Sequence, residues 1–405
     1  SQWSVVQQCL HNRGPDSNKA IPVEIGGWRG YVGHVRLRIV DLYAHADQPF
    51  KIDNFTLLFN GEIYNYKEIR ETLQKLGVDF CTDSDTEVLL RAYIRWGQDA
   101  FSRFDGMWAL VILDETERTI MMARDHFGEK PLFYNIEPQG KVVFASTASA
   151  IKCIDPSVNV HSFDFMRDFI REGYSSDSQS VWENVNKLGP GERVVFNLEN
   201  GELKRSQSAT LPFLETQSNS IFSIDTFEEL LVESLRLRLR ADVSVALLLS
   251  GGIDSSYVAA LAKQELGVQL ETITIADDIG GSEETNRASL VTKYLGLEHS
   301  VIDVKTSDIA SLYKNSLDAM DEPISDPSFP MLIELMSKIP DKTKVVLSGD
   351  GADELFLSYS NYNSILLKNE GVIGGGDGFG RLLHRSIYHY PENLKKVIKR
   401  VWRFI

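Results

Sequence analysis

The stretch with the clearest chemical pattern is a glycine turn that follows an apolar run. Residues 243–249 are largely apolar, and the next seven read Ser250-Gly-Gly-Ile-Asp-Ser-Ser256 before a run of helix-forming residues begins at Tyr257. This order predicts a buried strand, a tight turn and a helix start capped by Asp or Ser. Such a turn directs backbone N–H groups and the positive helix end at one point, which predicts an anion site.

A second acidic glycine turn, Ser348-Gly-Asp-Gly-Ala-Asp-Glu354, follows the apolar run 344–347. Ligands of open α/β sheets bind outside the carboxyl ends of the strands, so both turns are expected to face one ligand. Backbone N–H groups bind phosphate oxygens, and the carboxylates of Asp254 and Asp353 suit Mg²⁺, which predicts a phosphate–magnesium site. Neither turn carries the Lys of GxxxxGK[ST], so γ-phosphate transfer by that route is not expected. The alternative, that each turn only connects a strand to a helix, is disfavoured by their matching positions.

The elements that must position these turns change character along the chain. Before residue 204, short apolar segments separated by turn residues predict strands at 31–40, 55–60, 107–113, 119–123, 141–145 and 193–197, with helices at 66–76 and 85–96. Clustered strands with few helices favour an α+β sandwich. After residue 223, strands at 243–249, 270–275, 298–304 and 344–347 alternate with helices at 226–239, 283–295, 308–319 and 330–339. This alternation predicts an α/β doubly wound parallel sheet.

Length and composition agree with two domains. A chain of 405 residues exceeds what one hydrophobic core usually serves. We expect a first domain at 1–203, a polar linker at 204–222 and a second domain at 223–405. The formal charge of −15 argues against nucleic-acid and anionic-membrane partners.

The cysteines and the first residues indicate a cytoplasmic protein. The three cysteines are widely spaced and form neither a CxxC pair nor a zinc pattern, as in a reducing compartment. Cys9 is expected to be a buried small residue within a helix at 1–12. The N-terminal residues lack the features of a signal peptide, and no apolar run is long enough to cross a bilayer.

Several motifs carry a resemblance to a known family. The turn at Ser250–Ser256 resembles the pyrophosphate-binding loop of the ATP pyrophosphatases, and Ser348–Phe356 with Asp321-Glu-Pro323 resembles the asparagine synthetase branch. The N-terminal half is similar to the glutaminase domain of class II amidotransferases, an Ntn-hydrolase-like fold. The motifs that carry this second resemblance, in order, are Arg13-Gly-Pro-Asp16, residues 34–41, Phe59-Asn-Gly-Glu-Ile-Tyr-Asn65, Ser84-Asp-Thr-Glu87 and residues 124–132. Together these similarities cover residues 11–362.

The resemblance implies a glutamine pocket in the N-terminal half. It assigns Arg36 to the substrate α-carboxylate, and Glu62 with Asp85 to its ammonium group. Asn60 and the N–H of Gly61 become the catalytic oxyanion hole. The rest of the pocket segment is Leu37, Arg38, Ile39 and Val40. Taken singly, Arg36 is better explained as a surface ion-pair residue and Asn60 as a turn residue, but the ordered set of motifs favours the pocket.

The resemblance also implies an ATP site in the C-terminal half. It places the backbones of Leu249 and Ile275 at the adenine, and Asp254 with Asp353 at Mg²⁺. The remaining nucleotide contacts are Ser250, Gly251, Gly252, Ser255 and Ser256 at the pyrophosphate, with Ser348 and Gly349. Asp350 falls where relatives often have a catalytic Glu, and it is either a catalytic residue in acyl-adenylate formation or a turn-forming Asp.

The sequence also departs from the family pattern. The family's glutaminase nucleophile is an N-terminal Cys, whereas this chain begins with Ser1. The family's catalytic Lys and Arg-x-Pro-Phe-Leu-Asp segment are not found after Tyr362. We therefore expect a fragment of a longer protein, and no glutaminase activity from these 405 residues alone.

Together the motifs indicate a ligase. The expected reaction is ATP- and magnesium-dependent amidation of aspartate to asparagine through an acyl-adenylate, with glutamine or ammonia as nitrogen donor and with AMP and pyrophosphate released. Its partners are the small molecules glutamine, aspartate and ATP, and the sequence is compatible with a homodimer. Alternatives are amidation of another carboxylate (a sugar uronate or a peptide), β-lactam-type cyclisation, and a nucleotide-binding module without turnover. The glutamine pocket motifs count against cyclisation.

Overall fold

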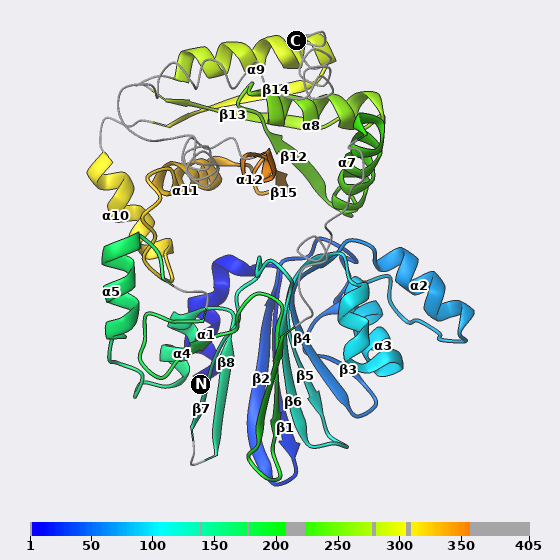
Figure 1. Ribbon diagram of the computed structural model, residues 1–405, viewed down its shortest axis with the longest axis vertical. Helices are drawn as coiled ribbons and strands as arrows, with labels where there is room; N and C mark the ends of the chain where they lie inside the picture. Colours follow the sequence, from blue (N-terminus) through cyan, green and yellow to red (C-terminus); the bar gives the residue numbers. More distant parts are fainter. Residues whose placement is uncertain are drawn as a thin grey trace, which may run out of the picture. The chain divides into compact units, whose positions relative to one another are not determined.

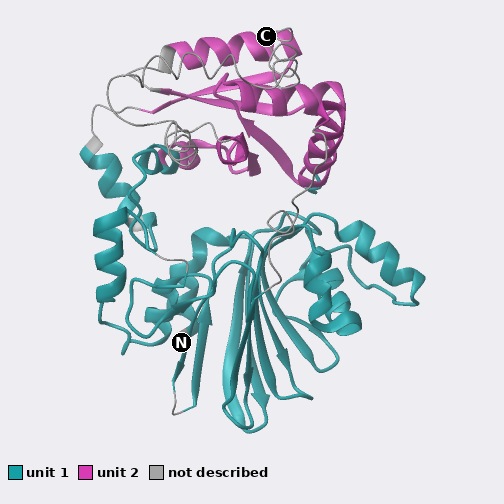
Figure 2. Cartoon of the chain, viewed as in Figure 1, with its two compact units in different colours: residues 1–218, 240–242, 310–333 teal, residues 219–239, 243–309, 334–405 magenta. Residues whose placement is uncertain are grey.

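The computed structural model describes residues 2–137, 140–175, 178–207, 223–277, 281–304 and 309–356. Its contacts divide the chain into two compact units (Figure 2). Unit 1 holds residues 1–218, 240–242 and 310–333, and unit 2 holds residues 219–239, 243–309 and 334–405. The chain therefore returns to unit 1 twice after first leaving it. Of the expected linker at 204–222, residues 208–222 lie outside the described part, and residues 204–207 belong to a strand.

Unit 1 is built mainly from antiparallel strands. Its strands are β1 (Ser17–Ile25), β2 (Trp28–Arg36), β3 (Phe50–Ile52), β4 (Phe55–Ile63), β5 (Gly106–Asp114), β6 (Thr119–Arg124), β7 (Phe133–Glu137), β8 (Lys141–Ala145), β9 (Asn186–Lys187), β10 (Glu192–Asn197) and β11 (Leu203–Gln207). Its helices are α1 (Gln2–Leu10), α2 (Tyr66–Lys75), α3 (Asp85–Trp96), α4 (Ala148–Ile154), α5 (Phe163–Glu172) and nearly all of α10 (Ile309–Ala319). Short 3₁₀ turns lie at His11–Arg13, Ala44–Ala46 and Gly97–Arg103.

These elements form a layered α+β sandwich (Figure 1). The central sheet has the order β11-β10-β6-β5-β4-β3, and every strand pair in it is antiparallel. Side chains alternate along a strand, so Leu57 and Phe59 of β4 pack against α2 and α3 while Leu58 packs against the second strand layer. That layer contains the β1-β2 pair and the β8-β7-β9 sheet. The expected α+β fold is confirmed.

Unit 2 is a parallel α/β sheet. Its elements are α7 (Ile224–Arg238), β12 (Ser244–Leu248), α8 (Ile253–Gln264), β13 (Glu271–Asp277), α9 (Gly281–Leu295), β14 (Glu298–Val304), β15 (Thr343–Leu347) and α12 (Ala352–Phe356), while α11 (Phe329–Lys338) begins in unit 1 and ends here. The strand order is β14-β13-β12-β15, and all three pairs are parallel. Leu247 packs with α7, α8 and α9 on one face of the sheet, and Ala246 packs against Leu335 of α11 on the other. Helices on both faces confirm the doubly wound class.

The sequence missed or misplaced some elements. The expected strand at 31–40 ends at Arg36, because the segment after it bends around the Arg36 side chain and reaches a positive φ of 55° at Asp41. Strands β1 and β7 and helices α4 and α5 were not anticipated. Cys9 is exposed and not buried, because α1 buries the stripe that contains Val6 and Leu10. In the described part of the chain, no helix has the length and apolar character needed to span a membrane.

Candidate active site

Arg36, the last residue of β2, organises one wall of the expected glutamine pocket. Its Nη1 donates to Asp47 Oδ1 (2.8 Å) and to the carbonyl of Tyr43 (3.2 Å). Its Nη2 donates to the carbonyls of Val40 (2.9 Å) and Asp41 (2.8 Å). The guanidinium therefore shapes the loop after β2. Its assignment to a substrate carboxylate stays a prediction, and a ligand that took both terminal nitrogens would displace these acceptors.

Asp47 closes the same loop from the other side. Arg38 donates to both of its oxygens, at 3.2 Å and 2.8 Å, and Ser17 Oγ donates at 2.7 Å. Burial alone raises the pKa of Asp47, but the hydrogen bonds from Arg38, Arg36 and Ser17 outweigh it and lower the pKa to about 2. Residues 36–47 include Leu37, Ile39 and Val40. The Asp47 carboxylate, which is ionised at neutral pH, holds this segment against β2 through Arg36.

The Asn60-Gly61-Glu62 segment, expected as a turn, is part of strand β4 and pairs with β5. Gly61 has a φ of +147°, and a Cβ there would stand 2.0 Å from the carbonyl oxygen of Met107, so only glycine fits. Asn60 Nδ2 and Glu62 Oε1 are buried and have no hydrogen-bond partner among the described residues. Buried polar atoms normally have partners, so an unpaired donor and an unpaired acceptor beside a required glycine indicate a place for a polar ligand.

Asp85 and Glu62 bring two carboxyl groups to this segment. Asp85 begins α3 and accepts a hydrogen bond from the Ile63 N–H at 3.1 Å. Burial raises the pKa of Asp85 to about 6, against the hydrogen bonds that it accepts from Ile63 and Thr86. Burial and then the charge of Asp85 raise the pKa of Glu62 to about 7, opposed by Lys130. An ammonium group placed between them would favour the ionised forms of both.

A largely apolar cavity of about 750 Å³ adjoins Asn60. Its lining residues come from β2, β4, β5 and β8 and from Trp3, Val6 and Leu10 of α1. His34 also lines it; one ring nitrogen, Nε2, lies 3.0 Å from the Phe59 carbonyl, and Nδ1 is buried without a partner in the described chain. Burial lowers the pKa of His34 to about 4, so its imidazole is neutral at physiological pH.

In unit 2 the two glycine turns follow adjacent parallel strands, β12 and β15. Gly251 has a φ of +71°, and a Cβ there would stand 2.5 Å from the backbone nitrogen of Ala288 in α9. Ser250 Oγ accepts from the Gly252 N–H (3.2 Å) and lies 3.1 Å from Ser255 Oγ. Ser256 Oγ is buried without a partner in the part of the chain that the structure describes. The first turn thus presents hydroxyls and the start of α8 together, as an anion site requires.

The second turn lies against the first. A Cβ on Gly349 would be 3.3 Å from the Ser255 nitrogen and 3.5 Å from Asp254 Cβ. Burial and then the charge of Asp353 raise the pKa of Asp254. A pair of adjacent carboxylates is a suitable donor set for Mg²⁺, because a hard cation removes their repulsion. The expected convergence of the two turns is confirmed, while Mg²⁺ itself stays a prediction.

The other residues expected to contact the nucleotide lie at the same end of this sheet. The Leu249 N–H donates to the Ile273 carbonyl (2.9 Å), and its own carbonyl accepts from Thr274 Oγ1 (2.6 Å). The expected adenine contact would therefore have to compete with Ile273 for the N–H, whereas the carbonyl keeps a second lone pair. Ile275 lies in β13, the neighbouring strand.

Asp350 and Ser348 form their own small motif in the second turn. Ser348 Oγ donates to Asp350 Oδ2 at 2.8 Å, and the Asp350 backbone N–H lies 3.4 Å from the same hydroxyl oxygen. Both residues are exposed or partly exposed. This geometry fits a turn-forming Asp, and its catalytic role is a prediction.

Two groups of residues to which the sequence assigned no role hydrogen-bond to segments of unit 1 that are distant in the sequence. The Asp321-Glu-Pro323 motif docks on unit 1, where Asp321 accepts from Ala148 and Ser149 at the start of α4. Glu322 accepts from the Val181 N–H (3.0 Å) and from Lys187 Nζ (3.1 Å). The tripeptide 240–242 contacts the glutamine-pocket segments. Only the first group had a sequence signal, its motif.

These two sites agree with the comparisons with known proteins. Residues 2–207 match the family described as glutamine amidotransferase domain, and residues 226–390 match the family described as asparagine synthase. The chain therefore contains a glutamine amidotransferase domain followed by a synthase domain.

The relatives place the chain in one family. Asparagine synthetase (glutamine-hydrolysing) 1 of Bacillus subtilis is 30% identical over 89% of this chain and 56% of its own length. A protein of Methanocaldococcus jannaschii, provisionally named asparagine synthetase (glutamine-hydrolysing) 2, is 30% identical over 88% of this chain and 72% of its own. The chain belongs to the glutamine-hydrolysing asparagine synthetase family. It spans about half the length of most of the curated relatives that it matches.

A solved structure shows a more distant likeness. It is a glutamine phosphoribosylpyrophosphate amidotransferase from B. subtilis complexed with ADP and GMP. The two chains are 17% identical with a TM-score of 0.39, over 74% of this chain and 77% of that one.

Proposed function

We propose that the complete protein amidates aspartate to asparagine with ATP, using glutamine or ammonia as the nitrogen donor. The observation that carries this proposal is the close approach of the two glycine turns, where a Cβ on Gly349 would be 3.3 Å from the Ser255 nitrogen near the start of α8. A glycine turn that lacks the Walker Lys suits binding of the departing pyrophosphate. The relatives' names supply aspartate as the acid.

The proposed synthetase reaction uses the residues for positioning and charge. The carboxylate of aspartate attacks the α-phosphorus of ATP, which breaks the bond to the pyrophosphate and forms an acyl-adenylate; ammonia then displaces AMP. The hydroxyls of Ser250, Ser255 and Ser256 with the nearby N–H groups bind the pyrophosphate oxygens. Asp254 and Asp353 would hold Mg²⁺, which when bound neutralises charge on the leaving pyrophosphate.

The proposed glutamine pocket supplies the ammonia. Glu62 and Asp85 bind the substrate ammonium, and Asn60 Nδ2 with the Gly61 N–H stabilises the oxyanion of the tetrahedral intermediate. The unpaired Nδ2 of Asn60 is the donor that such a site requires. The Arg36 loop borders the pocket and fixes its entrance.

A pyrophosphate-release assay on the complete gene product tests this function. We expect release that depends on aspartate, ATP and Mg²⁺, with either glutamine or ammonium chloride as nitrogen donor. Asp353→Asn is expected to raise the Mg²⁺ concentration needed for half-maximal rate about tenfold, since one hard ligand is lost. Release with other carboxylates but not with aspartate would overturn the assignment of the acid substrate.

A further inference from the structure

A tripeptide far from the expected glutamine-pocket motifs in sequence hydrogen-bonds to two segments beside them, at Ile39–Asp41 and at Tyr64. Residues 240–242 lie between α7 and β12, yet their contacts place them in unit 1 (Figure 2). None of the motifs described above includes them. We propose that Arg240 and Asp242 are positioning residues for glutamine, a role that rests on the proposed function of the pocket.

Asp242 holds the loop that follows Arg36. Its Oδ2 accepts from the Asp41 N–H (2.8 Å), and its own N–H donates to the Ile39 carbonyl (2.9 Å). One bond is made by the Asp242 side chain and the other by its backbone, and both attach the tripeptide to the segment that follows Arg36. They hold Asp41 at its positive φ of 55°, where its carbonyl meets the guanidinium of Arg36.

Asp41 passes this constraint on to the segment before α3. Its carboxylate is buried, and Oδ2 accepts from the Asp83 N–H at 2.9 Å. Asp83 stands two residues before Asp85, the carboxylate expected at the substrate ammonium. Displacement of Asp41 would therefore move Asp85 as well as the Arg36 loop.

Arg240 contacts the segment that follows Asn60–Glu62. Its Nη1 donates to the Tyr64 carbonyl at 3.0 Å. The two terminal nitrogens also bind both oxygens of Glu68 in α2, at 2.6 Å and 2.5 Å. The Arg240 side chain is 18% exposed and that of Glu68 is 53% exposed, so the firmness of this pair comes from its bidentate geometry and not from burial. Tyr64 is two residues from Glu62, so Arg240 adds a contact beside the segment that the Ile63–Asp85 hydrogen bond already joins to α3.

Steady-state kinetics of the complete protein tests this role. Asp242→Ala is expected to raise the KM for glutamine about tenfold in glutamate formation, because a buried N–H loses its acceptor. It is expected to leave the kcat of ammonia-dependent pyrophosphate release unchanged. Asp242→Asn retains an oxygen for the Asp41 N–H and is expected to restore the KM to within about twofold.

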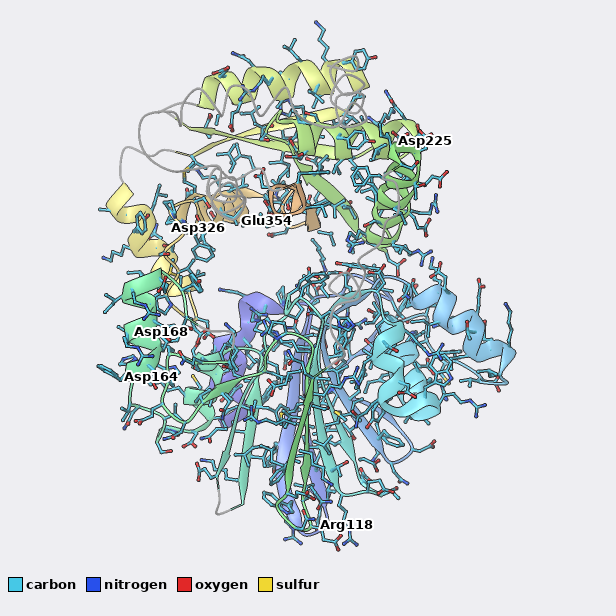
Figure 3. All side chains as sticks on the ribbon, in the orientation of Figure 1. Arg118, Asp164, Asp168, Asp225, Asp326 and Glu354 are labelled. Atoms are coloured by element: carbon cyan, nitrogen blue, oxygen red, sulfur yellow. The ribbon has the colours of Figure 1, made fainter. Side chains whose placement is uncertain are left out.

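Two further variants separate positioning from general damage. Arg240→Lys keeps one donor but loses the bidentate geometry, so a rise of about threefold in glutamine KM is expected. Arg118→Ala removes an exposed ion pair with Glu199 at the turn before β6 and is the matched control (Figure 3). It is expected to change neither assay.

The outcomes are distinguishable. Equal loss of glutamine- and ammonia-dependent activity in Asp242→Ala, without rescue by Asp242→Asn, would overturn the positioning role, as would an unchanged glutamine KM. Absence of ammonia-dependent pyrophosphate release in the unmodified complete protein would overturn the proposed function instead. Glutamate formation would still test Asp242 in that case, because it needs no acid substrate.

Discussion

At the scale of single residues, proximity and burial set the chemistry of the carboxyl pair in unit 1. Glu62 is 8% exposed and faces Asp85, so its proton is retained at a pH where an exposed Glu is ionised. From the sequence, the family resemblance assigns both residues the same role, which is to bind the substrate ammonium group. The structure separates them: Asp85 is held by the Ile63 N–H, whereas Glu62 Oε1 is buried without a hydrogen-bond partner among the described residues.

This shift predicts a pH-dependent stability difference at Glu62. The folded protein binds this proton more tightly than the unfolded chain, whose Glu has its ordinary pKa of 4.5. The contribution of Glu62 is therefore most favourable below pH 4.5 and is lost as the pH rises through about 7. Glu62→Gln removes this dependence. As the pH rises through this range, the difference in free energy of unfolding between Glu62→Gln and the unmodified protein should therefore shift by about 3 kcal/mol in favour of the variant.

Urea unfolding at pH 4.5 and pH 8 measures this difference. Glu24→Gln, at a carboxylate that is 62% exposed, is the control and is expected to show the same small change at both pH values. A constant difference between Glu62→Gln and the unmodified protein at both pH values would contradict the raised pKa.

At the scale of elements, β4 is a regular strand interrupted by one conformation that only glycine adopts. Gly61 stands opposite Trp108 and has a φ of +147°, and the pairing of β4 with β5 continues through it from Asn60 to Glu62. The close approach of the Met107 carbonyl leaves no room for a Cβ. Gly61 therefore belongs both to strand β4 and to the expected glutamine pocket.

Substitution of this glycine is expected to be costly. Gly61→Ala combines a disfavoured φ with a contact of 2.0 Å, so the free energy of unfolding should fall by about 3 kcal/mol or more. Gly30→Ala in β2 is the matched control: no heavy atom lies within 4 Å of its Cβ position, and a change within about 0.5 kcal/mol is expected. Denaturant unfolding of both variants decides the matter, and equal effects would refute the steric argument.

At the scale of the whole molecule, the chain is not divided into two consecutive blocks. Residues 310–333 pack with unit 1 although the residues on both sides of them belong to unit 2. Asp321 accounts for part of this docking, because its two oxygens accept the Ala148 and Ser149 N–H groups while Thr147 accepts that of Ala150. The first turn of α4 is therefore capped by a residue from a distant segment.

Removal of this cap should loosen α4 and the docked segment together. Asp321→Ala leaves the Ala148 and Ser149 N–H groups without their acceptor, at a cost of about 1–2 kcal/mol. Hydrogen exchange should accelerate in residues 148–150 and in 310–333. Asp326→Ala, which removes an exposed local turn contact to Ser328, is the control (Figure 3). Faster exchange in α4 alone would show that Asp321 caps the helix without docking the segment.

The sequence by itself determined the two fold classes, most element positions and both glycine turns. These depend on hydrophobic period and turn chemistry, which are local properties. Helix α3 and strands β8 and β14 have the bounds expected from such patterns. The order of the motifs also indicated the family, whose membership the comparisons confirm.

Only the tertiary structure decided which distant groups meet. It showed that Arg36 already binds four protein acceptors, that Gly349 approaches Ser255, and that residues 240–242 hydrogen-bond to Asp41 and Tyr64. Hydrogen bonds such as that between Asp41 and Asp242 join residues about two hundred positions apart, and no local pattern encodes such a pairing. The motifs therefore identify the residues that could take part in the chemistry, whereas tertiary packing decides where the side chains of those residues lie.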